Sequence, residues 1–150
     1  MKNLSKFFTR YVTFLALLPL SIQADQKFSI LKTIADANSS PAVYIDLGAP
    51  GSSLGDQYIF DQPLLNDQGE AIGSNSGFCL RTKKSHSLQC QWTLTLDNGT
   101  IQVAGREFDR GESFIPIVGG TGKYATITGY MRSSIMQDGR FQQILHYRLL

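Results

Sequence analysis

Residues 119–123, Gly-Gly-Thr-Gly-Lys, form the first stretch of this sequence that could do chemistry. Backbone N–H groups of a glycine-rich loop, together with a lysine ammonium, can bind a phosphate. A P-loop, however, needs a glycine five residues before its Gly-Lys pair and a Ser or Thr after it, and those positions hold Ile117 and Tyr124. Because glycine permits positive φ and close backbone approach, the stretch instead predicts a bulged turn between two strands. Its structural glycines are Gly119, Gly120 and Gly122.

The cysteines Cys79 and Cys90 form the second candidate. They flank residues 80–89, whose centre, Lys-Lys-Ser-His, is polar and typical of a turn. If this hairpin folds about its midpoint, the two cysteines lie opposite each other, and a cross-strand disulfide is geometrically possible. A disulfide, a buried pair of free thiols and a reactive thiol all remain open.

The two histidines and the one close cluster of cationic residues do not indicate a functional site. His86 falls in the predicted turn and His146 in a C-terminal strand, and neither has a serine or carboxylate at motif spacing. This pattern argues against a catalytic triad and against a metal site. We interpret the cluster of Arg81, Lys83 and Lys84 as a solvated hairpin tip.

Short strands separated by turn signals must position these residues, since no segment shows a convincing helical period. Residues 89–96 alternate between apolar and polar, and Asn98-Gly99 is a strong hairpin turn. An evenly spaced meander favours closure into a barrel, because closure removes exposed sheet edges. We therefore predict an all-β fold with an eight-stranded antiparallel up-and-down barrel, wide enough inside for side chains or one small ligand. The expected strands are residues 28–35, 42–47, 57–65, 71–81, 89–96, 100–108, 113–118, 124–131 and 141–150.

The N-terminus carries the marks of a signal peptide. Three cations precede an uncharged apolar run at residues 11–20, and Ala24 offers a small residue for cleavage. We expect a signal peptide over residues 1–24 and one barrel domain over residues 25–150, in a secreted or periplasmic protein. The apolar run is shorter than the roughly 18 residues that a span needs, so no membrane span is expected in the mature chain.

Removal of that segment also changes the charge. Without Lys2, Lys6 and Arg10 the formal net charge falls from +2 to −1, so the basic balance belongs to the targeting segment and no nucleic-acid partner is expected. Export to an oxidising compartment favours the disulfide among the three states of the cysteines.

Five short motifs follow one another along the chain: Phe60-Asp61-Gln62-Pro63-Leu64, Gly77-Phe78-Cys79, Ile101-Gln102-Val103-Ala104-Gly105-Arg106, residues 115–124, and Gly129-Tyr130. They occur in the order and spacing of the dirigent family. On these motifs the chain resembles dirigent proteins, which share a barrel superfamily with allene oxide cyclases. Dirigent proteins steer the coupling or cyclisation of phenolic intermediates, and the cyclases close a reactive fatty-acid epoxide, in both cases by positioning a reactive species.

The resemblance implies a secreted eight-stranded barrel, a homodimer or homotrimer, with an apolar cavity at its mouth for a small apolar or phenolic ligand. It implies no cofactor, whether metal or organic. Pro41, in a Ser-Pro pair, and Cys79 match pocket residues of the cyclases. The cyclase glutamate and its companion asparagine, however, fall on Lys32 and Ile34, and a dirigent arginine falls on Thr128.

Two charged residues are weak catalytic candidates. Asp61, in a matched motif, could stabilise a cationic intermediate at the barrel mouth, or it is a solvated turn residue. Arg106 could bind a carboxylate ligand bidentately, or it pairs on the surface with Glu107 or Asp109.

Four aromatic residues on predicted strands could line a cavity for an aromatic ligand, or they belong to the core. They are Phe60, Trp92, Tyr124 and Tyr130. Two functions therefore remain open. The first is a dirigent-like barrel that directs the cyclisation or isomerisation of its ligand, an isomerase-type activity that needs no cofactor. The second is a non-catalytic, lipocalin-like carrier or an envelope interaction module.

Overall fold

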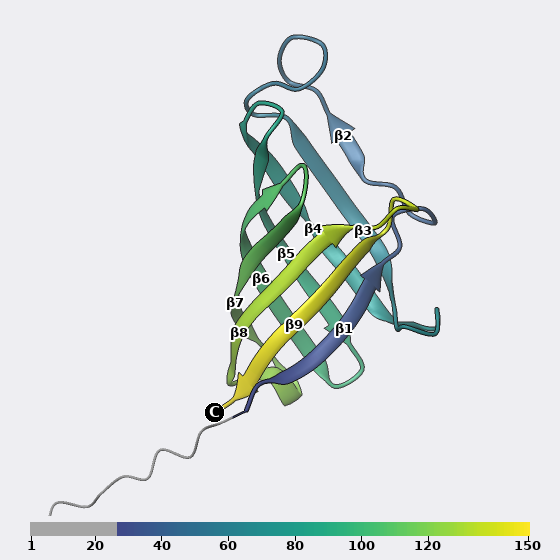
Figure 1. The fold of residues 1–150 in the computed structure, drawn as a ribbon, viewed down its shortest axis with the longest axis vertical. Coiled ribbons are helices and arrows are strands. Elements are labelled where there is room, and N and C mark those ends of the chain that lie inside the picture. The colour runs from purple at the N-terminus through teal and green to yellow at the C-terminus, as the bar shows by residue number, and fades with distance from the viewer. Residues whose placement is uncertain (1–26) are drawn as a thin grey trace, which may run out of the picture.

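A computed structural model of the protein describes residues 27–150, which are β-strands joined by turns and one short 3₁₀ turn (Figure 1). The predicted signal peptide lies outside the described residues. No helix within residues 27–150 is long and apolar enough to cross a bilayer. The elements are β1 (Ser29–Ala35), β2 (Val43–Ile45), β3 (Gln57–Leu65), β4 (Ala71–Lys83), β5 (Ser87–Leu96), β6 (Gly99–Phe108), β7 (Glu112–Gly120), η1 (Gly122–Tyr124), β8 (Ile127–Ile135) and β9 (Phe141–Leu149).

The sheet closes on itself. Neighbouring strands pair antiparallel in the order β1-β9-β8-β7-β6-β5-β4-β3, and β1 then pairs with β3 through Ile34↔Leu65 and Ala35↔Leu64. The short strand β2 pairs only with the first part of β3 and lies outside the ring (Figure 1). Eight strands, β1 and β3–β9, therefore form the predicted antiparallel barrel, and the prediction of fold class is confirmed.

The barrel has two different ends. The turns after β4, β6 and β8 gather with residues 36–56, which carry β2, at what we call the mouth end (Figure 1). The turns after β3 and β5, together with η1, form the opposite, closed end. This division follows from the meander, because successive turns of an antiparallel barrel alternate between its ends.

Alternating side chains fill the closed end with apolar groups. Leu94 on β5 and Ile101 on β6 are cross-strand partners, and both are fully buried. Leu145 on β9 is the partner of Met131 on β8, and these two are fully buried as well. Successive residues of a strand point to opposite faces, so the residues next to each of these four point outward. The core therefore lies inside the barrel, toward the closed end.

The glycine-rich stretch forms a tighter corner than predicted. Tyr124 does not begin a strand, because Tyr124 N–H donates to Thr121 C=O at 3.0 Å and Ala125 N–H donates to Gly122 C=O at 3.1 Å, which closes a 3₁₀ turn. Gly122 has φ +58°, and a Cβ there would lie 2.4 Å from the Asn98 carbonyl oxygen. The expectation of a strand from Tyr124 was therefore wrong, and β8 begins at Ile127.

The other two glycines of the motif differ from each other. A Cβ on Gly120 would lie 2.5 Å from the Tyr124 carbonyl oxygen, so the corner requires glycine there. Gly119 has open space around it and pairs with Gln102, next to a register shift between β6 and β7. The motif thus combines a bulge with a close backbone crossing.

Candidate functional site

A cavity of about 310 Å³ lies inside the barrel toward the mouth end. Its wall combines aromatic and aliphatic side chains with a small number of charged and amide groups. Seven strands, all those of the ring except β7, contribute to it, together with Ala42 and Asp109 from the connections. The lining residues are Ala35, Ala42, Tyr58, Phe60, Gln62, Asn75, Cys79, Arg81, Leu88, Trp92, Glu107, Phe108, Asp109, Ser133, Ile135, Phe141 and Gln143.

Strand alternation explains which residues reach this cavity. On β3 every second residue, Tyr58, Phe60 and Gln62, faces inward. On β4 the same alternation turns Cys79 and Arg81 inward. The side chains that carry chemistry are therefore held by backbone paired on both sides, which limits their movement.

Arg81 and Asp109 form an ion pair at the cavity. The Arg81 side chain is only 6% exposed, and its Nη1–H donates to Oδ1 of Asp109. Burial is the largest single effect and opposes the charge of Arg81, but Asp109, through its hydrogen bond and its charge, and Tyr58 together outweigh it and leave the pKa of Arg81 above its usual value. The prediction that Arg81 lies in a solvated hairpin tip was wrong. Lys83 and Lys84 are exposed as expected, whereas Arg81 shares the inward face of Cys79.

Glu107 is a second ionisable group of the wall, and its side chain is half-buried. The Ser133 hydroxyl donates a hydrogen bond to Oε1 of Glu107, across from β8 to β6. Burial raises the pKa of the Glu107 carboxyl, and the hydrogen bond from Ser133 opposes this only in part. The protonated form of Glu107 is therefore favoured over a wider pH range than that of an exposed glutamate.

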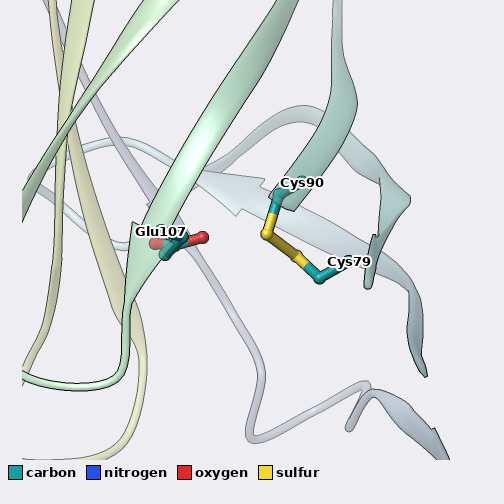
Figure 2. Close-up of side chains that lie close together, drawn as sticks. All are labelled: Cys79, Cys90 and Glu107. Carbon is teal, nitrogen blue, oxygen red and sulfur yellow. A yellow bond between two sulfur atoms is a disulfide. The ribbon is translucent and has the colours of Figure 1, made fainter. Parts of the chain in front are cut away.

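A disulfide joins Cys79 to Cys90 in the cavity wall beside Glu107 (Figure 2). The two cysteines are direct cross-strand partners on β4 and β5, so the hairpin folds about the predicted midpoint and the disulfide is confirmed. A Glu107 carboxylate oxygen and the two sulfur atoms lie within 4.8 Å of one another. Such a trio could bind a soft metal ion only after reduction, because a disulfide offers no thiolate.

Amide side chains add a hydrogen-bonded chain across the interior. The Thr33 hydroxyl donates to Oε1 of Gln143 at 3.0 Å, and Nε2 of Gln143 donates to Oδ1 of Asn75 at 3.4 Å. All three side chains are buried. These bonds fix the orientation of the two amides, so Asn75 and Gln143 are rigid parts of the wall.

Three of the residues predicted to line a cavity do so. Phe60, Cys79 and Trp92 all border the space described above. The rings of Phe60 and Trp92 meet edge to face, with centroids 6.3 Å apart. They form an aromatic part of the cavity wall.

The remaining candidates lie outside the cavity wall. Asp61 and Arg106 are exposed because their neighbours Phe60 and Glu107 face inward. Pro41 is exposed next to Ala42. Tyr130 lies on the outer face, stacked on His146 at 5.0 Å. Tyr124 is buried at the closed end against Tyr147, with ring centroids 6.1 Å apart.

Sequence reasoning missed the polar residues of the cavity. Strand alternation would have found part of these polar residues, starting from Cys79 and Phe60, which were predicted correctly. Arg81 lies two residues after Cys79, and Gln62 lies two residues after Phe60. Glu107 lies on the face of Ile101 and Val103 and carries no comparable signal, because Gly105 interrupts the apolar pattern. The missed residues are Tyr58, Gln62, Asn75, Arg81, Glu107, Asp109, Ser133 and Gln143.

The family model of the dirigent-like proteins matches residues 27–150, the whole of the described barrel. The chain belongs to the dirigent-like protein family. This assignment confirms the resemblance found in the motifs. No curated protein sequence matches this dirigent-like protein.

Solved structures share the barrel of this dirigent-like protein at low sequence identity. A pyocyanin demethylase is 24% identical, with a TM-score of 0.67 over 80% of this chain and 100% of that one. A pterocarpan synthase dirigent protein is 18% identical, with a TM-score of 0.63 over 81% and 95%. The Diels Alderase AbmU from Streptomyces koyangensis is 20% identical, with a TM-score of 0.67 over 82% of this chain and 64% of that one. At these identities the likeness shows the fold.

Proposed function

We propose that this dirigent-like protein binds one small apolar or phenolic molecule in its cavity and directs the cyclisation or isomerisation of that molecule, with Glu107 as proton donor. One observation carries the proposal. A carboxyl group with a raised pKa lies in the wall of a size-limited, largely apolar cavity. Perturbed acids in such pockets are characteristic of catalytic sites.

The cavity suits a rigid molecule of a few fused rings. A volume of about 310 Å³ lies at the lower end of the range for small-molecule sites. Phe60 and Trp92 offer ring edges and faces on one side, while Glu107 lies in the wall with Ser133. A ligand packed on the aromatic residues is thereby held in few orientations, which lowers the entropy cost of an intramolecular ring closure.

Glu107 supplies the chemical step in this proposal. Protonation of an electron-rich oxygen on the ligand promotes bond formation elsewhere in the same molecule, and a raised pKa keeps the donor protonated near its working pH. Ser133 orients the carboxyl through its hydrogen bond. Two structural neighbours, a pterocarpan synthase dirigent protein and a Diels Alderase, are named for ring-forming reactions, which supports such chemistry on this barrel.

Export and self-association belong to the same proposal. The N-terminal pattern of residues 1–24 and the Cys79–Cys90 disulfide support a secreted or periplasmic protein, because disulfides persist in oxidising compartments. A homodimer or homotrimer stays a prediction, which the native mass of the purified protein tests.

Product analysis tests the activity. The protein is supplied with phenolic radicals from a one-electron oxidant and, separately, with a reactive fatty-acid epoxide, and the ratios of the products are measured. We expect a biased product ratio for at least one substrate, and Glu107→Gln should slow that reaction by about 10²–10⁴-fold while binding persists.

Glu112→Gln is the matched control, because Glu112 pairs with Arg132 and does not border the cavity. It should retain the wild-type rate. Binding without any change in product ratio would instead identify a carrier. An unchanged rate in Glu107→Gln would contradict the role of Glu107.

A further inference from the structure

The outer face of four neighbouring strands combines apolar and cationic side chains. β1, β9, β8 and β7 lie side by side in the ring (Figure 1). Their outward side chains form rows of cross-strand partners, which are neighbours on the sheet surface. We call this surface, together with Lys27 and Phe28 just before β1, the basic face. Its middle row runs across all four strands through Ile30, His146, Tyr130 and Pro116.

Large apolar side chains of the basic face are open to solvent. Phe114 on β7 is 62% exposed, and Ile30 and Val118 are each more than half exposed. Phe28 is exposed as well, and its ring meets the ring of Tyr130 edge to face at 6.3 Å. Apolar side chains gathered on one surface mark a site that contacts another molecule or a membrane.

Cationic side chains surround these apolar groups. Lys32, Arg132 and Arg148 lie on β1, β8 and β9, and Lys27 precedes β1. Glu112, which pairs with Arg132, is the one acidic residue of β1, β7, β8 and β9. Over residues 27–150 the numbers of acidic and basic residues are equal. The positive charge of the basic face is therefore a local excess.

Two of the cations border a hollow where β1 begins and β9 ends. Lys27, Ser29, Arg148 and Leu149 line this hollow, so no acidic side chain borders it. Neither Lys27 nor Arg148 forms an ion pair within residues 27–150. The hollow thus combines an ammonium, a guanidinium and a hydroxyl, which are groups that bind phosphate oxygens.

The charges and the strand pairing exclude two other partners for the basic face. A second copy of the chain, bound through the same face in a two-fold contact, would bring like charges together, which weakens association. A peptide strand finds no free backbone at the centre of the face, because β8 and β9 are paired on both sides. A bilayer with anionic lipids instead offers phosphates to the cations and an interface to the apolar side chains.

We infer that the basic face binds the surface of an anionic lipid bilayer, with a lipid phosphate held by Lys27, Ser29 and Arg148 and with Phe28 and Phe114 inserted among the headgroups. None of these residues borders the cavity. The inference is therefore independent of the proposed cyclisation or isomerisation, and either can fail without the other.

Co-sedimentation with vesicles tests the inference. The processed protein, isolated after export, is mixed with vesicles of phosphatidylcholine alone or of phosphatidylcholine and phosphatidylglycerol in equal parts. We expect at least about tenfold tighter binding to the anionic vesicles at about 0.1 M salt. About 0.5 M salt should weaken this binding, because salt screens exposed charges.

A matched pair of double variants tests the cations. Lys27→Gln/Arg148→Gln should lower the affinity for anionic vesicles by about tenfold, since each cation near the membrane surface adds to the attraction. Lys83→Gln/Lys84→Gln makes the same charge change in the exposed turn after β4 and should lower the affinity by no more than about twofold.

A matched pair of phenylalanine variants tests the apolar contact. Phe114→Ala should lower the affinity for anionic vesicles by about fivefold, because a ring that inserts into the interface is lost. Phe78→Ala removes a ring that is 52% exposed on β4, across the barrel from the basic face, and should leave the affinity unchanged. Thermal unfolding of each variant verifies that its barrel is intact.

Several results would overturn the inference. Equal binding to the two kinds of vesicle, or binding to neither, would do so. Equal losses of affinity in the basic-face variants and in their controls would show that the contact lies elsewhere. Equally tight binding of soluble polyglutamate would show a general attraction to polyanions. A stable oligomer that dissociates in Phe114→Ala would assign the face to other copies of the chain.

Discussion

The two ends of the barrel interior follow the same strand alternation but contain opposite kinds of residue. At the closed end, the cross-strand pair Leu94 and Ile101 is fully buried and apolar. Toward the mouth, the same strands β5 and β6 border a cavity, and β6 presents Glu107. Apolar burial at one end stabilises the fold, so the other end can hold buried polar groups that cost stability. The following predictions test this division, beginning with the largest expected effect.

Leu94→Ala should lower the stability of the protein at the closed end and leave ligand binding at the mouth end unchanged. It leaves a cavity among fully buried side chains, and we expect the free energy of unfolding to fall by about 2–5 kcal/mol. The affinity for a rigid apolar probe of the cavity, such as fluorene, should stay within about twofold of wild type, because Leu94 does not border the cavity. Urea unfolding and calorimetric titration measure the two quantities.

Leu80→Ala is the matched control, since Leu80 is 39% exposed on the outer face of β4. Its unfolding free energy should change by less than about 1 kcal/mol. A ligand affinity that falls together with stability in Leu94→Ala would show that the two ends are not independent.

Loss of the disulfide, which lies in the cavity wall on the mouth side, should lower the stability of the protein. The bridge joins residues separated by 11 positions, and its removal frees the unfolded chain, so we expect the double variant Cys79→Ala/Cys90→Ala to lose about 2–4 kcal/mol of unfolding free energy. Urea unfolding with and without reductant measures this effect. Reductant should lower the stability of the wild type and leave the double variant unchanged. An equal response of both proteins would contradict the prediction.

The pH dependence of stability should report on Glu107. Its pKa in the folded protein is raised above the ordinary value of 4.5, so between 4.5 and the raised value the folded state holds a proton that the unfolded state has released. Stability from this group is present at low pH and is lost as pH rises through that window. The wild type should therefore lose stability relative to Glu107→Gln as pH increases above about 4.5.

Thermal unfolding of both proteins across pH 4 to 8 measures the difference. Glu112→Gln again serves as control, and its difference from wild type should not follow the same curve. A constant difference between wild type and Glu107→Gln over that range would show that the Glu107 carboxyl is not perturbed.

Local patterns were enough to predict most of the barrel. The predicted strand 57–65 matches β3 at both ends, and residues 89–96 gave the correct inward face of β5. Turn residues such as Asn98-Gly99 set the hairpins, so the closed ring followed from short-range rules. The disulfide followed from the same hairpin symmetry.

Whether several polar side chains point into or out of the barrel could not be predicted from the sequence. The run from Tyr58 to Gln62 mixes apolar and polar residues without clean alternation, so nothing local shows that Asp61 points out. Arg81 lies one residue before a register shift, and its burial depends on Asp109 from a distant turn. Whether Asp61 or Arg106 takes part in catalysis stays a prediction, although both lie outside the cavity wall.

The pairing of β1 determines when the barrel can close during folding. Ser29, near the start of β1, pairs with Tyr147 in β9, so the first strand to be synthesised waits for the last before it gains most of its hydrogen bonds. Its other neighbour, β3, offers only two residue pairs. Contacts so distant along the chain slow folding, because the entropy cost of joining the two ends precedes the gain in bonding. The ring therefore closes late, and a chain that lacks β9 leaves both β1 and β8 as open edges.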